Sequence, residues 1–193
     1  MESKFTLPPN KKRILICGRS GSGKTHLLNL LLQNGFNRCR SCTSRKPRIG
    51  EESSEEYYFV SEQKVFDLIR EDEAICYTQL GGNWYALERK EFNKDKAVFC
   101  IIPSAINLLS LKQIKESLII YLDVPDELRL ERLKERVTNK ENALAREQKE
   151  AEEFFGFKCY DVCIDDPLFT LDSVFDRIKK KNDGESSPFL FGS

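Results

Sequence analysis

Short apolar runs that alternate with helical segments predict an α/β fold, a doubly wound parallel sheet with helices on both faces. Three runs carry this prediction, because an uninterrupted apolar stretch of such length is typical of a buried parallel strand: residues 13–17, 97–102 and 118–124. The first run ends at Gly18 and leads into a helical pattern over residues 25–33. A chain of 193 residues is long enough for one such domain with small inserted segments.

The other elements follow from periodicity and capping. Residues 57–60 are strand-like, and Ser61 then begins a helix, because a serine hydroxyl can accept the first free amide hydrogens. The remaining predicted elements are charged helices over 127–136 and 140–155, a short strand over 160–164 and a closing helix over 171–180. Residues 181–193 are polar and contain Gly, Ser and Pro, which predicts a mobile C-terminal tail.

Composition argues against several classes of protein. Lys plus Arg and Asp plus Glu both number 31, so the formal charge of zero gives no indication of a general nucleic-acid or anionic-membrane surface. No run approaches the roughly 20 apolar residues of a membrane-spanning helix, and the first ten residues lack the apolar block of a signal peptide. Seven cysteines, several inside apolar runs, indicate a reducing compartment and predict a cytoplasmic protein.

One motif predicts a nucleotide-phosphate site. The segment Gly18-Arg19-Ser20-Gly21-Ser22-Gly23-Lys24-Thr25 matches G-x-x-x-x-G-K-[ST] in full, between a predicted strand and a predicted helix. Its glycines allow the backbone to approach phosphate closely, and the amides of such a loop point inward. Lys24 is expected to reach the β- and γ-phosphates of ATP and the Thr25 hydroxyl to hold Mg²⁺. The residues predicted to bind ATP are therefore Gly18, Ser20, Gly21, Ser22, Gly23, Lys24 and Thr25.

Further along the chain, several collinear motifs resemble those of the guanylate kinase family. They are R-S-C-T-S-R-K-P-R-I-G-E over residues 40–51 with Y-Y-F-V over 57–60, then G-N-W-Y over 82–85, the arginines 132, 136 and 146, and Tyr160-Asp161 before Asp165-Asp166. The resemblance covers residues 14–178. It implies a P-loop kinase core with a small acceptor-binding insertion at about 37–95 and a helical lid at about 134–150, in a domain over residues 1–180.

The resemblance also implies a role for individual residues. The phosphate of an acceptor nucleotide would be held by Arg45, Arg48, Tyr57 and Tyr85, and its base would be contacted by Ser41. Two arginines three residues apart can both bind one phosphate, which supports the first assignment independently. The catalytic residues would be Lys24 and the lid arginines Arg132, Arg136 and Arg146, which would stabilise charge on the transferred group.

Other positions depart from the family pattern. Cys76 stands where the family has a glutamate that reads guanine, and Leu87 stands where the family has a serine. Two family aspartates fall at Ile101 and Pro103. Asp123 lies at the end of a predicted strand, where it could act near magnesium or cap a turn.

Together these features predict a nucleoside monophosphate kinase that transfers the γ-phosphate of ATP, with Mg²⁺, to a small nucleotide, GMP or dGMP by family default. Cys76 belongs to the predicted substrate-binding set, although a thiol cannot replace a carboxylate as a double acceptor. The alternatives are a kinase for a non-guanine or modified nucleotide, or an inactive guanylate kinase-like binding module. We expect a monomer or a homodimer.

Overall fold

The computed structural model describes residues 5–47, 55–134 and 140–182, except for the side chains of residues 140–146. The strands are β1 (Arg13–Gly18), β2 (Asn37–Arg38), β3 (Ser41–Thr43), β4 (Tyr57–Phe59), β5 (Ala74–Leu80), β6 (Asn83–Glu88), β7 (Ala97–Cys100), β8 (Ser117–Leu122) and β9 (Val162–Ile164). The helices are α1 (Lys24–Gln33), α2 (Glu62–Arg70), α3 (Arg89–Phe92), α4 (Pro103–Ile106), α5 (Leu111–Lys115), α6 (Asp126–Lys134), α7 (Lys140–Phe154) and α8 (Leu171–Asn182).

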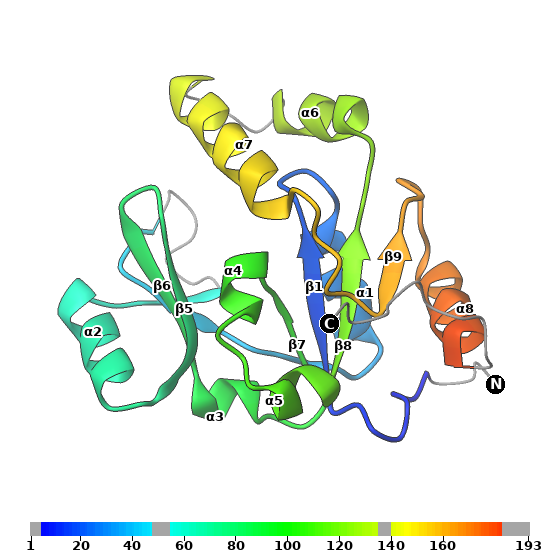
Figure 1. The fold of residues 1–193 in the computed structure, drawn as a ribbon, viewed down its shortest axis with the longest axis horizontal. Coiled ribbons are helices and arrows are strands. Elements are labelled where there is room, and N and C mark those ends of the chain that lie inside the picture. The colour runs from blue at the N-terminus through cyan, green and yellow to red at the C-terminus, as the bar shows by residue number, and fades with distance from the viewer. Residues whose placement is uncertain (1–4, 48–54, 135–139, 183–193) are drawn as a thin grey trace.

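The larger of two sheets is parallel throughout and has the strand order β2-β7-β1-β8-β9. Its central strand β1 is buried along its whole length and pairs with β7 on one side and β8 on the other. Helices connect these parallel strands and cover the sheet (Figure 1). The predicted α/β class with a parallel core sheet is confirmed.

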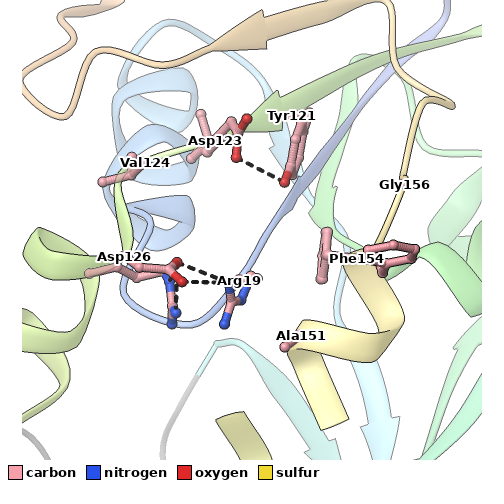
Figure 2. Close-up of a pocket in the computed structure, with 11 residues that line it drawn as sticks. Arg19, Tyr121, Asp123, Val124, Asp126, Ala151, Phe154 and Gly156 are labelled. Carbon is pink, nitrogen blue, oxygen red and sulfur yellow. Dashed lines mark hydrogen bonds and ion pairs between the residues drawn. The ribbon is translucent and has the colours of Figure 1, made fainter. Parts of the chain in front are cut away.

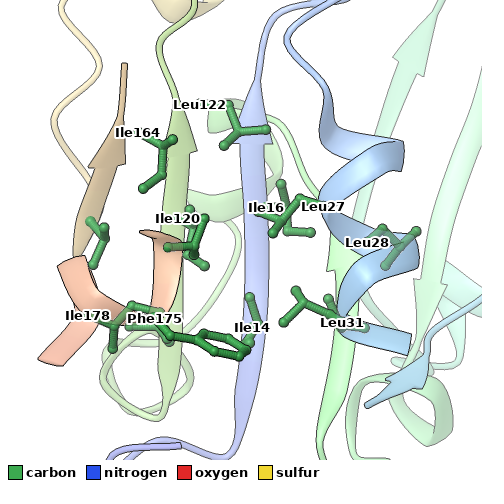
Figure 3. Packing of buried hydrophobic residues seen from close by; sticks show 14 of the residues in the cluster. Ile14, Ile16, Leu27, Leu28, Leu31, Ile120, Leu122, Ile164, Phe175 and Ile178 are labelled. Carbon is green, nitrogen blue, oxygen red and sulfur yellow. The ribbon is translucent and has the colours of Figure 1, made fainter. Parts of the chain in front are cut away.

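Two apolar clusters pack against opposite faces of this sheet, because successive strand residues point to opposite sides. Ile14 and Ile16 of β1 join the cluster formed with α1 and α8, including Leu27, Leu31 and Phe175 (Figure 3). The alternate residues of β1, Leu15 and Cys17, belong to the second cluster, which includes residues of α4 and the end of α7. The position of β1, and of the loop that follows it, is therefore fixed by packing on both faces.

The smaller sheet is mixed and has the order β4-β3-β6-β5. It lies in the chain between β2 and β7, which are neighbours in the larger sheet. Strands β5 and β6 form a hairpin whose turn, Gly81-Gly82, has φ values of +56° and +77°. Two consecutive left-handed residues are what a tight hairpin turn requires, and glycine adopts them without strain.

Helix α2 packs on this smaller sheet, where the Phe66 and Trp84 rings meet edge to face at 5.2 Å. As predicted, Ser61 caps α2: its hydroxyl oxygen accepts a hydrogen bond from the Lys64 amide at 3.2 Å.

Helices α6 and α7 stand above the ends of β1 and β8 (Figure 1). Several boundaries differ from the predicted ones; for example, β8 ends at Leu122 rather than 124 and β9 begins at Val162 rather than 160. Strand β7 ends at Cys100 rather than 102, because Ile102 is the N-cap of α4 and Pro103, its first residue, has no amide hydrogen for a strand. Helix α8 continues to Asn182, two residues into the predicted tail, and the rest of that tail lies outside the described residues. Within the described ranges, no helix is both long and apolar enough to cross a membrane.

Candidate active site

The phosphate-loop motif lies where the sequence predicts it, between the buried strand β1 and helix α1. Gly21 has a φ of +84°, and a Cβ at this position would lie 2.4 Å from the Arg129 carbonyl oxygen. No other residue fits so close to α6 without a shift of the backbone. The Ser22 hydroxyl is buried and has no hydrogen-bond partner among the residues that the structure describes. A tightly wound loop with an unsatisfied buried hydroxyl fits an anionic ligand such as phosphate.

The predicted catalytic lysine begins α1 and folds back over this loop. Lys24 Nζ donates hydrogen bonds to the carbonyl oxygens of Gly18 at 2.6 Å and Arg19 at 3.0 Å. Thr25, the predicted magnesium ligand, is the next residue of α1 and is exposed. Among the residues that the structure describes, no three His, Cys, Asp or Glu side chains gather as a metal site. Mg²⁺ in proteins is usually held by one or two protein oxygens together with waters and substrate phosphates, so the Thr25 hydroxyl alone is compatible with its predicted role.

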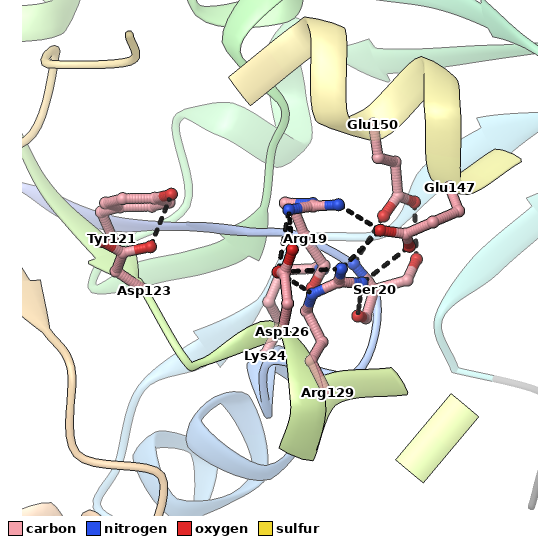
Figure 4. Close-up of polar contacts among 9 residues, drawn as sticks. All are labelled: Arg19, Ser20, Lys24, Tyr121, Asp123, Asp126, Arg129, Glu147 and Glu150. Atoms are coloured by element: carbon pink, nitrogen blue, oxygen red, sulfur yellow. Dashed lines mark hydrogen bonds and ion pairs between the residues drawn. The ribbon is translucent and has the colours of Figure 1, made fainter. Parts of the chain in front are cut away.

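A network of charged side chains joins the loop to α6 and α7 (Figure 4). At its centre the buried Arg129 guanidinium donates to the Ser20 carbonyl at 3.0 Å, to the Glu147 carboxylate and to Asp126 at 3.1 Å. Arg19 also binds Glu147 and Asp126. The Glu150 carboxylate accepts hydrogen bonds from the amide and the hydroxyl of Ser20, at 2.6 and 2.5 Å.

Of the predicted lid arginines, Arg132 reaches the loop directly. Its guanidinium donates to the carbonyl oxygen of Gly21 at 3.2 Å and to that of Pro167 at 3.0 Å, so it joins the loop to the segment after β9. Arg136 lies outside the described residues, as does Arg48 of the predicted acceptor site. Arg146 belongs to α7, and its side chain also lies outside the described part.

The other predicted acceptor-phosphate residues come together on the smaller sheet. Ser41 of β3 is the register partner of Tyr57 on β4, and the Tyr57 ring lies edge-on to Tyr85 of β6 at 5.8 Å. The Arg45 guanidinium lies 5.7 Å from the centre of the Tyr57 ring. The buried Thr43 hydroxyl fixes the backbone beside Arg45, because it accepts the Arg45 amide at 3.2 Å and donates to the Trp84 carbonyl at 3.0 Å.

One thiol is close to both groups of residues. Cys100, at the end of β7, reaches solvent, yet desolvation by the surrounding protein raises its pKa to about 11 while the Lys24 charge opposes this shift. Burial likewise raises the pKa of the Tyr57 hydroxyl to about 12, with Tyr85, Glu56 and Cys100 adding to the shift. Cys100 is thus electrostatically coupled both to Lys24 of the loop and to Tyr57 of the smaller sheet.

Comparison with known proteins identifies the family. The sequence model of the family described as guanylate kinase matches residues 10–180. The chain belongs to the guanylate kinase family. It is 36% identical over 143 residues to the guanylate kinase of Prochlorococcus marinus subsp. pastoris, covering 70% of this chain and 78% of that protein. It is 33% identical over 153 residues to the guanylate kinase of Nostoc sp., covering 76% and 77% of the two chains.

The fold agrees with that of a solved structure. The crystal structure of guanylate kinase from Anaplasma phagocytophilum aligns with a TM-score of 0.65 over 90% of this chain and 85% of that one, at 21% identity. The predictions of the family and of an ATP-dependent nucleoside monophosphate kinase are confirmed.

The two departures from the guanylate kinase pattern at the base-reading positions are neighbours in space. Cys76 of β5 is the register partner of Leu87 on β6, and both side chains are buried in the second apolar cluster. Burial raises the pKa of the Cys76 thiol to about 12, so the thiol stays neutral. The two positions therefore hold apolar side chains, where the family pattern has a glutamate and a serine.

The carboxylate of Asp123, directly after β8, is hydrogen-bonded to a tyrosine. Asp123 Oδ1 accepts a hydrogen bond from the Tyr121 hydroxyl at 3.1 Å. Both residues line a cavity of about 360 Å³ between the phosphate loop and the end of α7, together with Arg19 and the aromatic ring of Phe154 (Figure 2). At the end of β7, the two positions where the family has aspartates hold a buried Ile101 and the first residue of α4, Pro103.

Sequence reasoning missed the residues that join the loop to the two helices above it: Arg19, Asp126, Arg129, Glu147 and Glu150. In the sequence, the charged residues of the predicted helices over 127–136 and 140–155 are typical of helix faces exposed to solvent. One signal was present, since Arg129 and Arg132 are three residues apart and so share a helix face, as do Glu147 and Glu150.

Proposed function

We propose that this chain transfers the γ-phosphate of ATP to GMP or dGMP. The observation that carries the proposal is the complete phosphate loop, in which Lys24 folds back over the loop and Gly21 is left-handed, together with the Arg45 guanidinium beside the Tyr57 ring on the smaller sheet. Cys100, at the end of β7, is electrostatically coupled to Lys24 and to Tyr57, which supports binding of the donor and acceptor phosphates near that end of the strand. Phosphoryl transfer needs chiefly such positioning and stabilisation of charge, without a covalent intermediate.

At the donor side, the loop amides and Lys24 would bind the β- and γ-phosphates of ATP, and the Thr25 hydroxyl would hold Mg²⁺. The ion would neutralise phosphate charge when bound. Arg132 already contacts the loop, and we assign it, with Arg136 and Arg146, to the charge that develops on the transferred group.

At the acceptor side, Arg45, Arg48, Tyr57 and Tyr85 would hold the nucleotide phosphate. The Tyr57 ring supports this assignment, because it lies 5.7 Å from the Arg45 guanidinium and meets the Tyr85 ring edge-on at 5.8 Å. Ser41, next to Tyr57 in register, would contact the base. Cys76 would line the base site only as an apolar contact, given its burial.

A coupled assay of ADP release against all ribo- and deoxyribonucleoside monophosphates tests the proposal. We expect turnover with GMP and dGMP above the others, and none with any acceptor when Lys24 is replaced by Ala. Preference for a different base would move the proposal to that acceptor. If ATP binds and no acceptor supports turnover, the kinase activity is refuted for this chain and a binding role remains.

We also propose that the protein is cytoplasmic and works as a monomer or a homodimer. All seven cysteines lie in the described part of the chain and all are free, which is the usual state of thiols in a reducing compartment.

A further inference from the structure

The carboxylate of Glu150, on α7, lies on the phosphate loop. It accepts two hydrogen bonds from one residue, at 2.6 Å from the Ser20 amide and at 2.5 Å from the Ser20 hydroxyl (Figure 4). Inward-pointing amides of such a loop are the donors that bind nucleotide phosphates. A carboxylate and a phosphate are both anionic acceptors, so the two groups cannot use the Ser20 amide at the same time.

This contact belongs to a docked helix face. Glu147, one turn before Glu150, binds Arg19 and the buried Arg129, and Arg129 also donates to the Ser20 carbonyl at 3.0 Å. Glu153, one turn after Glu150, accepts the Ser104 amide of α4 at 2.5 Å. Residues three apart along a helix share a face. Three acidic residues spaced three apart, Glu147, Glu150 and Glu153, thus hold the last part of α7 against the loop and α4.

We propose that Glu150 sets the affinity for the donor nucleotide by competing with its phosphates for the Ser20 amide and hydroxyl. The inference rests on the proposed donor site at the phosphate loop. Binding of ATP would displace the Glu150 carboxylate and shift the end of α7 away from the loop. The apparent dissociation constant then equals the intrinsic one divided by the fraction of molecules in which the loop is open. A ligand without phosphates does not use the Ser20 amide, so the Glu150 carboxylate does not compete with it.

Removing the Glu150 carboxylate should therefore strengthen the binding of ligands that carry phosphates and leave the binding of ligands without phosphates unchanged. We expect Glu150→Ala to bind ATP about tenfold more tightly by calorimetry, as follows if the contact is closed in about nine molecules of ten. Glu150→Gln should show a smaller gain, because its amide oxygen can still accept a hydrogen bond without carrying charge. Inorganic tripolyphosphate should show the same gain as ATP, and adenosine should show none.

A matched control separates competition from a general loss of negative charge. Glu152 is exposed on the same helix, so Glu152→Gln removes the same charge without touching the loop. We expect its ATP affinity to stay within twofold of the wild type. If Glu152→Gln tightens ATP binding as much as Glu150→Gln does, or if both Glu150 variants bind ATP as the wild type or more weakly, the inference is wrong.

A second arm separates this inference from the donor site itself. Lys24→Ala should weaken ATP binding both in the wild type and in the Glu150→Ala background. Normal ATP binding in both Lys24 variants would refute the donor site. A loss caused by Lys24→Ala with no gain from Glu150→Ala would leave the donor site in place and refute the competition alone.

Discussion

Replacing Arg129 with Met should destabilise the protein more than loss of any surface ion pair. The Arg129 side chain is 1% exposed, whereas those of its partners Glu147 and Asp126 are 19% and 59% exposed. Removing one member of a fully buried pair commonly costs ~3–5 kcal/mol, because the other charge stays buried and unpaired. Water can reach both carboxylates here, so we expect a smaller loss in the free energy of unfolding, about 2–3 kcal/mol. In a domain of this size that corresponds to a fall in Tm of about 5–10 °C.

Urea denaturation followed by circular dichroism measures this loss. Arg177→Met is the matched control, because Arg177 pairs with Asp165 at the surface, with exposed fractions of 44% and 67%. Such exposed pairs contribute ~0–1 kcal/mol. A double-mutant cycle with Glu147→Gln should give a coupling energy of roughly 1–2 kcal/mol between Arg129 and Glu147. If Arg129→Met costs no more than Arg177→Met, the network does not hold α6 and α7 on the loop.

Three further predictions concern the acceptor side. Arg45→Ala should raise the KM for GMP by about tenfold or more with ATP affinity unchanged, since a charge-assisted hydrogen bond contributes ~1.5–3 kcal/mol. If the KM for GMP of this variant equals that of the wild type, Arg45 does not belong to the phosphate site. The Tyr57 hydroxyl has a folded-state pKa of about 12, above the ordinary value of 10.0, so stability should be full below pH 10 and fall as pH rises toward 12. This loss should be smaller in Tyr57→Phe, and equal losses in both proteins would contradict the shift. The double variant Cys76→Glu with Leu87→Ser should raise the turnover of GMP relative to other monophosphates. It should also lower the stability of the protein, because the new carboxylate enters an apolar cluster. An unchanged acceptor preference would show that other residues read the base.

The central strands of the core could be predicted because each of them is recognisable from its own residues. β1 and β8 are buried on both faces, so their residues form continuous apolar runs. The hairpin of β5 and β6 was missed because Tyr77 and Gln79 are exposed and interrupt the apolar pattern. The Gly81-Gly82 turn between them was the available signal.

The candidate site likewise has a part that the sequence predicts and a part that it does not. The phosphate loop could be predicted, because its chemistry depends on local backbone and eight consecutive residues specify it. The contacts of Glu150 with Ser20 could not, because they depend on how closely α7 lies over the loop, 130 residues away in sequence. Charged residues on a helix look alike in sequence whether they face water or another charge.

The place where the smaller sheet joins the larger one has a consequence for how such proteins can change. The inserted chain leaves after β2 and returns at β7, and these strands lie side by side, with Asn37 opposite Ala97 and Arg38 opposite Val98. Its two ends are hydrogen-bonded to one another, for Cys39 donates its amide to the Val98 carbonyl at 3.0 Å. A segment whose ends meet can be exchanged for another of different length or sequence without moving the strands that carry it. Because Ile75, Cys76, Leu87 and Phe92 of this segment also pack in the second apolar cluster with residues of β1, an exchange of residues 39–96 would have to keep apolar side chains at those positions.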